Sequence, residues 1–455
     1  MKSFNSLMAA LLPLLAAVVP AFSQTATDED YHVFTDSPRL LVTNQRLRLL
    51  QRERQRESMR WQQFDGFVSG GAPMPESGFA LALYYQVVRD PAAGKKAVEW
   101  AVGNSADPLR DLRQLALVFD WCAPVMTKQQ TDAFVAKLQR GLETPAPPGD
   151  IRRNSARALA AIAVADQLPD HGEAILKKLI QDWWRGDIVK RLAKGEPAIP
   201  REQLYALYEM LHGIRDNLRI DLRESAPEYF KALPVDHIAG HYPAPFEGPE
   251  NDYRVPIYAR EGEPDLTDAT LSRAAELSMV AFDNNAPESQ FLQGWLMQDR
   301  FLMRSALGTV YEFLWANPYQ PGLSYFHIPL VFHDAGTGHV FARTSWDEDA
   351  TWIGYFDGHL QYFADGKLQA LRPGAATKPV HVGEAVLLSA PDPEKGRFRA
   401  DAEAVFVLNL TPRAHYDVEV DDQELWEAET DVGGTLVLSL PEGTDAGVRI
   451  RRRTN

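Results

Sequence analysis

The sequence predicts a two-part fold, a series of paired α-helices followed by an antiparallel β-sandwich. Up to about residue 315, apolar residues recur at helical spacing in segments joined by short loops, which is typical of stacked helical hairpins. After Asn317 and Pro318 the segments become short, rich in β-branched and aromatic residues, and separated by Gly, Pro and Asp. A chain of 455 residues is long enough for each part to bury its own core.

The helical part is expected to cover residues 24–320. Its first helix is expected to begin after Thr43, whose side chain can cap it, and to end near Ser58. A stretch rich in Pro, Gly and Tyr, residues 234–264, is expected to form a long ordered loop. The other helices that apolar spacing predicts are 78–89, 107–121, 127–139, 155–165, 172–184, 201–214, 266–283 and 289–315.

The β part is expected to cover residues 321–455. Short strands with turn residues at regular spacing favour an antiparallel sandwich. The predicted strands are 325–330, 339–344, 351–356, 360–363, 385–389, 404–410, 416–420, 435–440 and 447–452.

The first 23 residues have the features of a secretory signal peptide. Lys2 supplies a positive charge, and the apolar stretch from Leu7 to Val19 is short for a bilayer span. Residues 21–23, Ala-Phe-Ser, fit the pattern read by signal peptidase, so cleavage is expected after Ser23. The alternative is an uncleaved anchor. The sequence thus predicts a periplasmic or secreted protein that is not membrane-bound once the signal is removed.

Composition excludes several function classes. The formal net charge of −15 repels phosphate backbones, so nucleic acid is not an expected partner. The one cysteine, Cys122, lies in an apolar run and is expected to be a buried apolar residue. GxSxG, P-loop, HExxH and strand-linked GxGxxG motifs are absent from the sequence, and neither a metal nor a cofactor is expected.

Three stretches resemble the heparinase II/III-like polysaccharide lyase superfamily. Residues 37–41, Ser-Pro-Arg-Leu-Leu, are similar to that family's opening segment, and residues 115–121, Leu-Ala-Leu-Val-Phe-Asp-Trp, to its LA-x-x-YDW helix. Residues 340–352, VFARTSWDEDATW, resemble the strand pair that opens the family's β-domain. The resemblance implies an incomplete (α/α) toroid whose cleft faces a β-sandwich. It also implies β-elimination on a uronate-containing glycan, with an acidic polysaccharide or oligosaccharide as partner.

β-Elimination needs a group that neutralises the uronate carboxylate, a base for the C5 proton and an acid for the leaving oxygen. The resemblance implies that Asn154 binds the carboxylate, and the alternative is a helix N-cap. His359 lies where the family has an H-x-H-x-D-x-G-x-F strand, of which one His remains, with Gln361 near the Asp position. We expect His359 to be catalytic. Arg343 is expected to position its strand or contact the glycan.

The predicted helix 201–214 carries a candidate catalytic face. Tyr205, Tyr208, Glu209 and His212 are spaced i, i+3, i+4 and i+7, so they can share one side of the helix. Tyr208 and His212 are expected to be catalytic and Tyr205 to contact substrate. The alternative is an interior helix with amphipathic side chains.

In the long loop, His241 and Tyr242 are expected to cover the cleft and bind substrate, because long loops in compact folds are often functional.

Three functions stay open on the sequence. The first is a lyase for an acidic polysaccharide, and the second is a non-catalytic glycan-binding relative. The third is a glycoside hydrolase on a toroid, with Glu202 or Glu209 paired with an Asp across the cleft. The enzymatic prediction depends on Asn154, the helix of Tyr208 and His212, and His359 lining one groove between the two parts.

Overall fold

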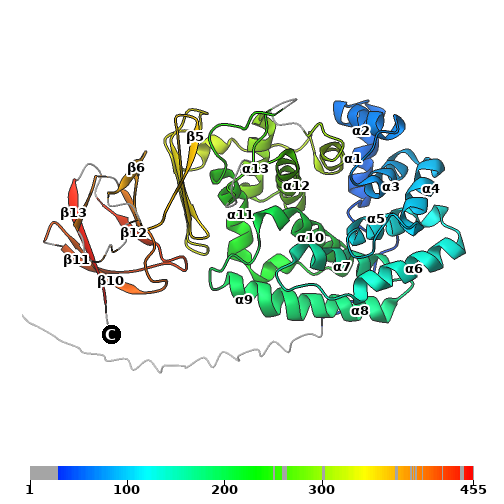
Figure 1. The fold of residues 1–455 in the computed structure, drawn as a ribbon, viewed down its shortest axis with the longest axis horizontal. Coiled ribbons are helices and arrows are strands. Elements are labelled where there is room, and N and C mark those ends of the chain that lie inside the picture. The colour runs from blue at the N-terminus through cyan, green and yellow to red at the C-terminus, as the bar shows by residue number, and fades with distance from the viewer. Residues whose placement is uncertain are drawn as a thin grey trace, which may run out of the picture.

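The structure is a computed structural model. It describes residues 29–248, 252–258, 264–299, 303–374, 378–389, 392, 394, 397–401, 403–422, 424–440 and 445–453. The predicted signal peptide, residues 1–23, lies outside these ranges. The predicted fold class is confirmed, with an all-helical N-terminal region followed by antiparallel β-sheets (Figure 1). Among the described residues, no helix is both long and apolar enough to cross a bilayer.

The helical region consists of consecutive helices, and a π-helical segment (Leu179–Ile188) joins two of them. The α-helices are α1 (Asn44–Gln55), α2 (Met59–Ser69), α3 (Ser77–Val88), α4 (Pro91–Val102), α5 (Leu112–Cys122), α6 (Lys128–Glu143), α7 (Ile151–Ala163), α8 (Pro169–Lys178), α9 (Val189–Leu192), α10 (Leu204–Leu218), α11 (Pro227–Ala239), α12 (Leu266–Phe282), α13 (Pro287–Gln298) and α14 (Gly308–Trp315).

The structure corrects the helix prediction in several places, and α2, α4, α9 and α11 lie outside the predicted helices. The single helix predicted for residues 289–315 is two helices, α13 and α14. The long loop predicted from residue 234 begins later, because α11 continues through Pro234 to Ala239. Pro234 is tolerated well inside the helix, and this extension places His237 on a helix rather than in a loop.

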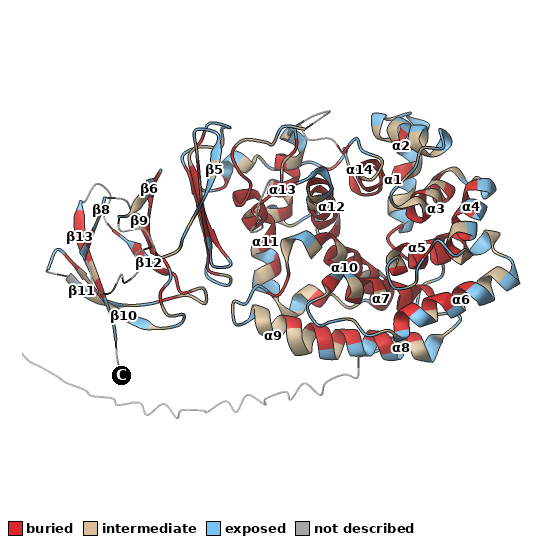
Figure 2. Cartoon of the chain, in the orientation of Figure 1, coloured by how far each residue is buried: buried red, intermediate tan, exposed pale blue. Residues whose placement is uncertain are grey.

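The inner helices form a ring. α3, α5, α7, α10, α12 and α14 pack each against the next, and α2 closes the ring between α14 and α3. α4, α6 and α8 pack outside them, so their outer faces are exposed while the inner helices are largely buried (Figure 2). This arrangement brings the N-terminal ends of several inner helices to one end of the ring and their C-terminal ends to the other.

Two of the motifs that carry the family resemblance contact each other. The Asp120 carboxylate on α5 accepts hydrogen bonds from the backbone N–H groups of Arg39 and Leu40, both at 2.8 Å. The next residue, Trp121, donates its indole N–H to the carbonyl of Leu40 at 2.9 Å. The segment before α1 is therefore anchored to the core of the helical ring by a single buried turn of α5.

The described residues of the β-region form three sheets, with strand orders β1-β2-β3-β4-β5, β11-β10-β13-β8 and β12-β9-β7-β6. The strands are β1 (Val331–Asp334), β2 (His339–Arg343), β3 (Trp352–Phe356), β4 (His359–Ala364), β5 (Lys367–Leu371), β6 (Val380–Val382), β7 (Ala385–Leu388), β8 (Arg397–Ala400), β9 (Ala404–Val407), β10 (His415–Val420), β11 (Glu424–Glu429), β12 (Leu436–Ser439) and β13 (Ala446–Arg452).

The strand details differ from the prediction in three ways. Five strands lie outside the predicted ones: β1, β5, β6, β8 and β11. The strand predicted at 325–330 is wrong, because Tyr325–His327 forms a 3-10 turn and β1 begins only at Val331. The pair β7–β9 is parallel whereas the other pairings are antiparallel. It is parallel because β8 crosses to another sheet between them, so β9 returns in the direction of β7.

The sheets stack as layers on the helical region. Val340 and Ile353 of the five-stranded sheet share a core with Leu387 and Phe406 of the β12-β9-β7-β6 sheet. On the opposite face, Phe341, Trp352 and Phe356 pack with Ala239 and Tyr242 from the helical region. The five-stranded sheet is thus covered on both faces, which explains why every residue of β2 and β3 is buried.

A buried polar chain also joins the two regions. Asp236 on α11 accepts a hydrogen bond from Arg201 at 2.5 Å and pairs with His339 Nδ1 on β2 at 2.8 Å. His339 Nε2 lies 3.2 Å from Asp357 Oδ1 at the end of β3. Burial alone would lower the pKa of His339, but Asp236 and Asp357 outweigh burial and raise it to about 9.

This raised pKa predicts a loss of stability at alkaline pH. The unfolded imidazole has a pKa of 6.5, so the stabilisation is complete below that pH and is lost as the pH rises through about 9. The contribution lost is about 3 kcal/mol. We expect the urea-unfolding free energy of the wild type to fall over this range relative to His339→Gln. Parallel curves for the two proteins would contradict the prediction.

Candidate functional site

The N-terminal ends of the inner helices surround a cavity of about 580 Å³. Charged and aromatic side chains from α5, α7, α10 and α14 and from the segments before several inner helices meet here. Its lining includes Glu76, Asp111, Arg113, Asp150, Arg152, Arg153, Glu202, Tyr205, Glu209, Leu271 and Tyr311. Several helix N-termini converge at this end of the ring, and their dipoles favour the carboxylates placed among them.

An arginine connects two carboxylates in the wall of this cavity. Arg113 on α5 binds Glu209 through two nitrogens, with Nε at 2.5 Å and Nη2 at 2.7 Å. Its third nitrogen, Nη1, donates to Glu76 Oε2 at 2.9 Å. Burial alone would lower the pKa of Arg113, but Glu209 and Glu76 raise it well above its ordinary value. Arg113 is thus fixed as a cation between the two carboxylates.

Two tyrosines complete this network. Tyr205 donates to Glu209 Oε1 at 2.5 Å, and Tyr311 donates to Glu76 Oε2 at 2.6 Å. Burial raises the pKa of both phenols well above the ordinary value, and the neighbouring carboxylates add to the effect. These tyrosines therefore act as hydrogen-bond donors and are poor general bases.

Glu76 is the reachable carboxylate of the network. Its side chain is 25% exposed, whereas that of Glu209 is 1% exposed. Glu76 stands at the N-cap of α3, which directs its side chain to the cavity end of the ring. Glu209 follows Tyr205 by one turn of α10, and its buried position suits it to holding Arg113 in place.

A second cavity of about 480 Å³ lies between the helical ring and the five-stranded sheet. Its lining includes Arg201, Tyr258, Asp268, Phe356, Asp357 and His359. Glu202 and Leu271 line both this cavity and the first one. The two cavities therefore adjoin, and we call them together the toroid groove.

A third cavity, of about 810 Å³, lies at the C-terminal ends of the inner helices. We call it the basic cavity, since Arg46, Arg48, Arg52 and Arg215 line it together with Asp216. Its lining also includes His212, Trp315 and Tyr319. Burial lowers the pKa of Arg46 to about 10, so this guanidinium is still charged at neutral pH.

Three of the four predicted catalytic residues do not line the toroid groove. His212 lines the basic cavity, and burial lowers its pKa well below the ordinary value. Tyr208 is buried between Phe230 and Phe282, and burial raises its pKa. The predicted shared groove is therefore wrong, because Tyr208 points away from the groove toward Phe230 and Phe282, and His212 lies near the C-terminal end of α10, where it lines the basic cavity.

Asn154 is also placed differently from either alternative. The helix begins at Ile151, and Asp150 caps it by accepting from the N–H of Arg153. Asn154 lies within the first turns, is 3% exposed, and its amide lies 3.4 Å from the carbonyl of Pro147. The N-cap interpretation is therefore wrong, and a carboxylate-binding role would need a substrate to reach a buried amide.

Four of the residues singled out from the sequence line the groove, Glu202, Tyr205, Glu209 and His359. Tyr205 contacts the Arg113 network in the first cavity, while His359 is exposed at the start of β4 in the second. Tyr205 and His359 therefore lie in adjoining cavities.

The other predicted substrate-binding residues are buried in the contact between the helices and the sheet. Arg343 donates to the carbonyls of Ala239 and His241 at 3.3 and 2.7 Å, which matches the positioning role. Tyr242 donates to Gln361 Oε1 at 2.8 Å. The ring of His241 packs within the helical region and is 2% exposed. None of the three lines the described toroid groove.

Glu76, Arg113 and Tyr311 were missed by the sequence analysis. Glu76 precedes α3, Arg113 lies on α5 and Tyr311 on α14, so the three share no local motif. The available signal was the i, i+4 pair of Tyr205 and Glu209, which does reach the cavity.

Comparisons with known proteins leave the family open. No known family matches the sequence, and no curated protein matches it. Among solved structures, one titled "Glycoside hydrolase" matches with 11% identity and a TM-score of 0.32, covering 83% of this chain and 71% of that chain. A likeness of this extent assigns neither a family nor an activity.

Proposed function

We propose that the protein is a carbohydrate-active enzyme that binds a glycan along the toroid groove and hydrolyses a glycosidic bond there. The observation that carries the proposal is the pair of carboxylates in one cavity, Glu76 beside the Arg113 cation and Glu202 at the junction with the second cavity. Glycoside hydrolysis uses two carboxyl groups that flank the bond, one as acid and one as base or nucleophile.

The network assigns a role to each carboxylate. Glu76 accepts hydrogen bonds from Arg113 and Tyr311, which suits a base or nucleophile that must carry negative charge. Glu202 is exposed where the cavities meet, so it can reach the oxygen of the leaving sugar. Glu209 is a positioning residue, because it contacts Arg113 and Tyr205 rather than the open cavity.

Hydrolysis fits this site better than β-elimination does. Elimination needs a base for the C5 proton, and the raised pKa values of Tyr205 and Tyr311 disfavour both phenols in that role. It also needs a group that neutralises the uronate carboxylate. Arg113 already binds Glu76 and Glu209, so this role would fall to Arg152 or Arg153 of the same lining. An elimination mechanism in the groove would therefore have to use His359 as its base.

A second candidate function is binding of an acidic oligosaccharide in the basic cavity. Arg46, Arg48, Arg52 and Arg215 give this cavity an excess of positive charge in a chain whose net charge is −15. Trp315 supplies an aromatic ring in the same lining. The first cavity of the groove, in contrast, mixes arginines with at least as many carboxylates. The basic cavity is therefore the better place for an anionic chain.

One screen separates these functions. We expect incubation with neutral and uronate-containing polysaccharides to release reducing ends without the ultraviolet absorbance of an unsaturated uronate. Growth of that absorbance would replace hydrolysis by elimination. If neither signal appears but acidic glycans raise the melting temperature, and Arg48→Ala/Arg52→Ala abolishes that shift, the basic-cavity function replaces the enzymatic one.

The proposal includes export of the protein, as predicted from its first 23 residues. If residues 1–23 direct secretion, the enzyme meets its glycan in the periplasm or outside the cell.

A further inference from the structure

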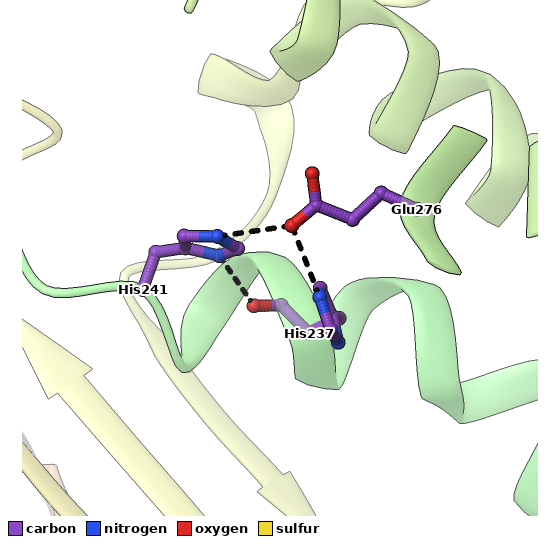
Figure 3. Close-up of side chains that lie close together, drawn as sticks. All are labelled: His237, His241 and Glu276. Atoms are coloured by element: carbon purple, nitrogen blue, oxygen red, sulfur yellow. Dashed lines mark hydrogen bonds and ion pairs between the residues drawn. The ribbon is translucent and has the colours of Figure 1, made fainter. Parts of the chain in front are cut away.

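Two histidines and a glutamate meet in the interior where α11 and α12 support the five-stranded sheet. His237 lies in the last turn of α11, His241 just beyond it, and Glu276 on α12. Their ligand atoms all lie within 4.8 Å of one another (Figure 3). Glu276 Oε1 lies 3.1 Å from Nε2 of each histidine.

The two 3.1 Å contacts of Glu276 Oε1 are close to the ligand spacing in a transition-metal site. Ligand atoms about 2.0–2.1 Å from a tetrahedral zinc ion lie roughly 3.3–3.4 Å apart. Two imidazoles and a carboxylate are also a donor set that zinc accepts.

The hydrogen bonds around the cluster leave one histidine nitrogen facing the Glu276 carboxylate without a proton to donate. His241 Nδ1 lies 2.8 Å from the carbonyl of His237, which can only accept, so Nδ1 carries the proton. In the neutral ring Nε2 then carries a lone pair instead of a proton. This nitrogen makes no hydrogen bond in the described structure, although it lies 3.1 Å from Glu276 Oε1. A cation between the lone pair and the carboxylate would satisfy both groups.

The groups behind the cluster are those that orient metal ligands. A ligating histidine commonly donates its other ring N–H to a backbone carbonyl, as His241 does to His237. Arg273 lies 3.3 Å from Glu276 Oε2, which leaves Oε1 turned toward the two imidazoles.

We propose that His237, His241 and Glu276 bind a structural divalent ion of the zinc class. The three residues are 1%, 2% and 1% exposed, so the site is closed to a substrate-sized molecule. The bound ion would join the end of α11 to α12. This end of α11 also supports the β-region, since the carbonyl of Ala239 accepts from Trp352 at 3.0 Å and that of His241 accepts from Arg343 at 2.7 Å.

The metal content of the wild-type chain tests this proposal directly. We expect the purified, gel-filtered protein to retain about one zinc per chain by elemental analysis. Chelation should lower its melting temperature, and added Zn²⁺ should restore it. Co²⁺ added to the stripped protein should give the intense visible absorption of a tetrahedral site. Far less than one metal per chain, with a melting temperature that neither chelator nor Zn²⁺ changes, would overturn the proposal.

Variants locate the ion. Glu276→Gln and His241→Ala should lose the metal and the Zn²⁺-dependent rise in melting temperature. His339→Gln is the matched control, because His339 is another buried histidine paired with a carboxylate at the same boundary. It should keep the metal even though it is less stable. Metal retained by Glu276→Gln and His241→Ala would place the ion elsewhere and overturn the assignment. The wild-type measurements do not depend on whether the variants fold.

Discussion

Replacing Asp120 by alanine should destabilise the protein by about 3–5 kcal/mol, the usual cost of removing one partner from a buried charged network. Asp120 is 1% exposed, and its Oδ2 accepts from the N–H groups of Arg39 and Leu40. Its other oxygen lies 3.8 Å from the buried Arg39 side chain. Alanine would leave two buried N–H groups without an acceptor and remove a carboxylate from beside Arg39. Urea unfolding measures the loss.

Two control variants separate the effect of losing the hydrogen bonds from the effect of losing the charge. Burial raises the pKa of Asp120 to about 6, which shows that its charge is costly in this position. Asp120→Asn keeps an acceptor for the backbone and removes that cost, so it should lose clearly less stability than Asp120→Ala. Asp132→Ala breaks an exposed pair with Lys128 and should change little. Equal losses for the alanine and asparagine variants at position 120 would show that charge, not hydrogen bonding, anchors the segment.

The same contact shows why the fold could be predicted in outline. Apolar spacing predicts α5, and residues 37–41 and 115–121 resemble two motifs of one family. In the structure these two motifs contact each other, so their joint presence in the chain has a structural explanation. Strand pairing was harder to predict. The parallel β7–β9 pair depends on β8 leaving for another sheet, and no local pattern in the sequence encodes that crossing.

The site was harder to predict than the fold because it is assembled from distant segments. Helical spacing places Tyr205, Tyr208, Glu209 and His212 within one broad side of α10, but it does not indicate which turns reach an open cavity. Tyr205 and Glu209 reach the Arg113 network, whereas Tyr208 packs against aromatic rings and His212 faces the opposite end of the ring. That distinction is set by neighbouring helices, which periodicity within one helix cannot specify.

The prediction for α11 is wrong for a local reason. Pro234 predicts the start of a loop, yet α11 accommodates this proline and continues to Ala239. Because the helix is extended, His237 lies in its last turn and His241 just beyond it, where both can face one partner. The sequence contains the spacing of the two histidines, but it does not show that Glu276 approaches them from α12.

Replacing Glu76 by glutamine should lower kcat/KM on glycan on the order of 10³-fold, the range expected when a general base or nucleophile is lost. Glutamine keeps the size of the side chain and one acceptor oxygen for Arg113 or Tyr311. Glu76 is also partly exposed, so the melting temperature should change little. A large kinetic effect with a small thermal effect is therefore the expected signature. Reducing-end assays and thermal unfolding measure the two quantities on one preparation.

Three further variants test whether Glu76 acts on the substrate or only holds Arg113. Glu202→Gln should cause a comparable kinetic loss, because both carboxyl groups are needed for hydrolysis. Tyr311→Phe removes one hydrogen bond to Glu76 and should cost much less. In Glu76→Ala, added formate should restore part of the turnover by occupying the vacated position, which a purely structural role would not allow. Activity within about tenfold of wild type in both Glu76→Gln and Glu202→Gln would exclude this carboxylate pair as the catalytic one.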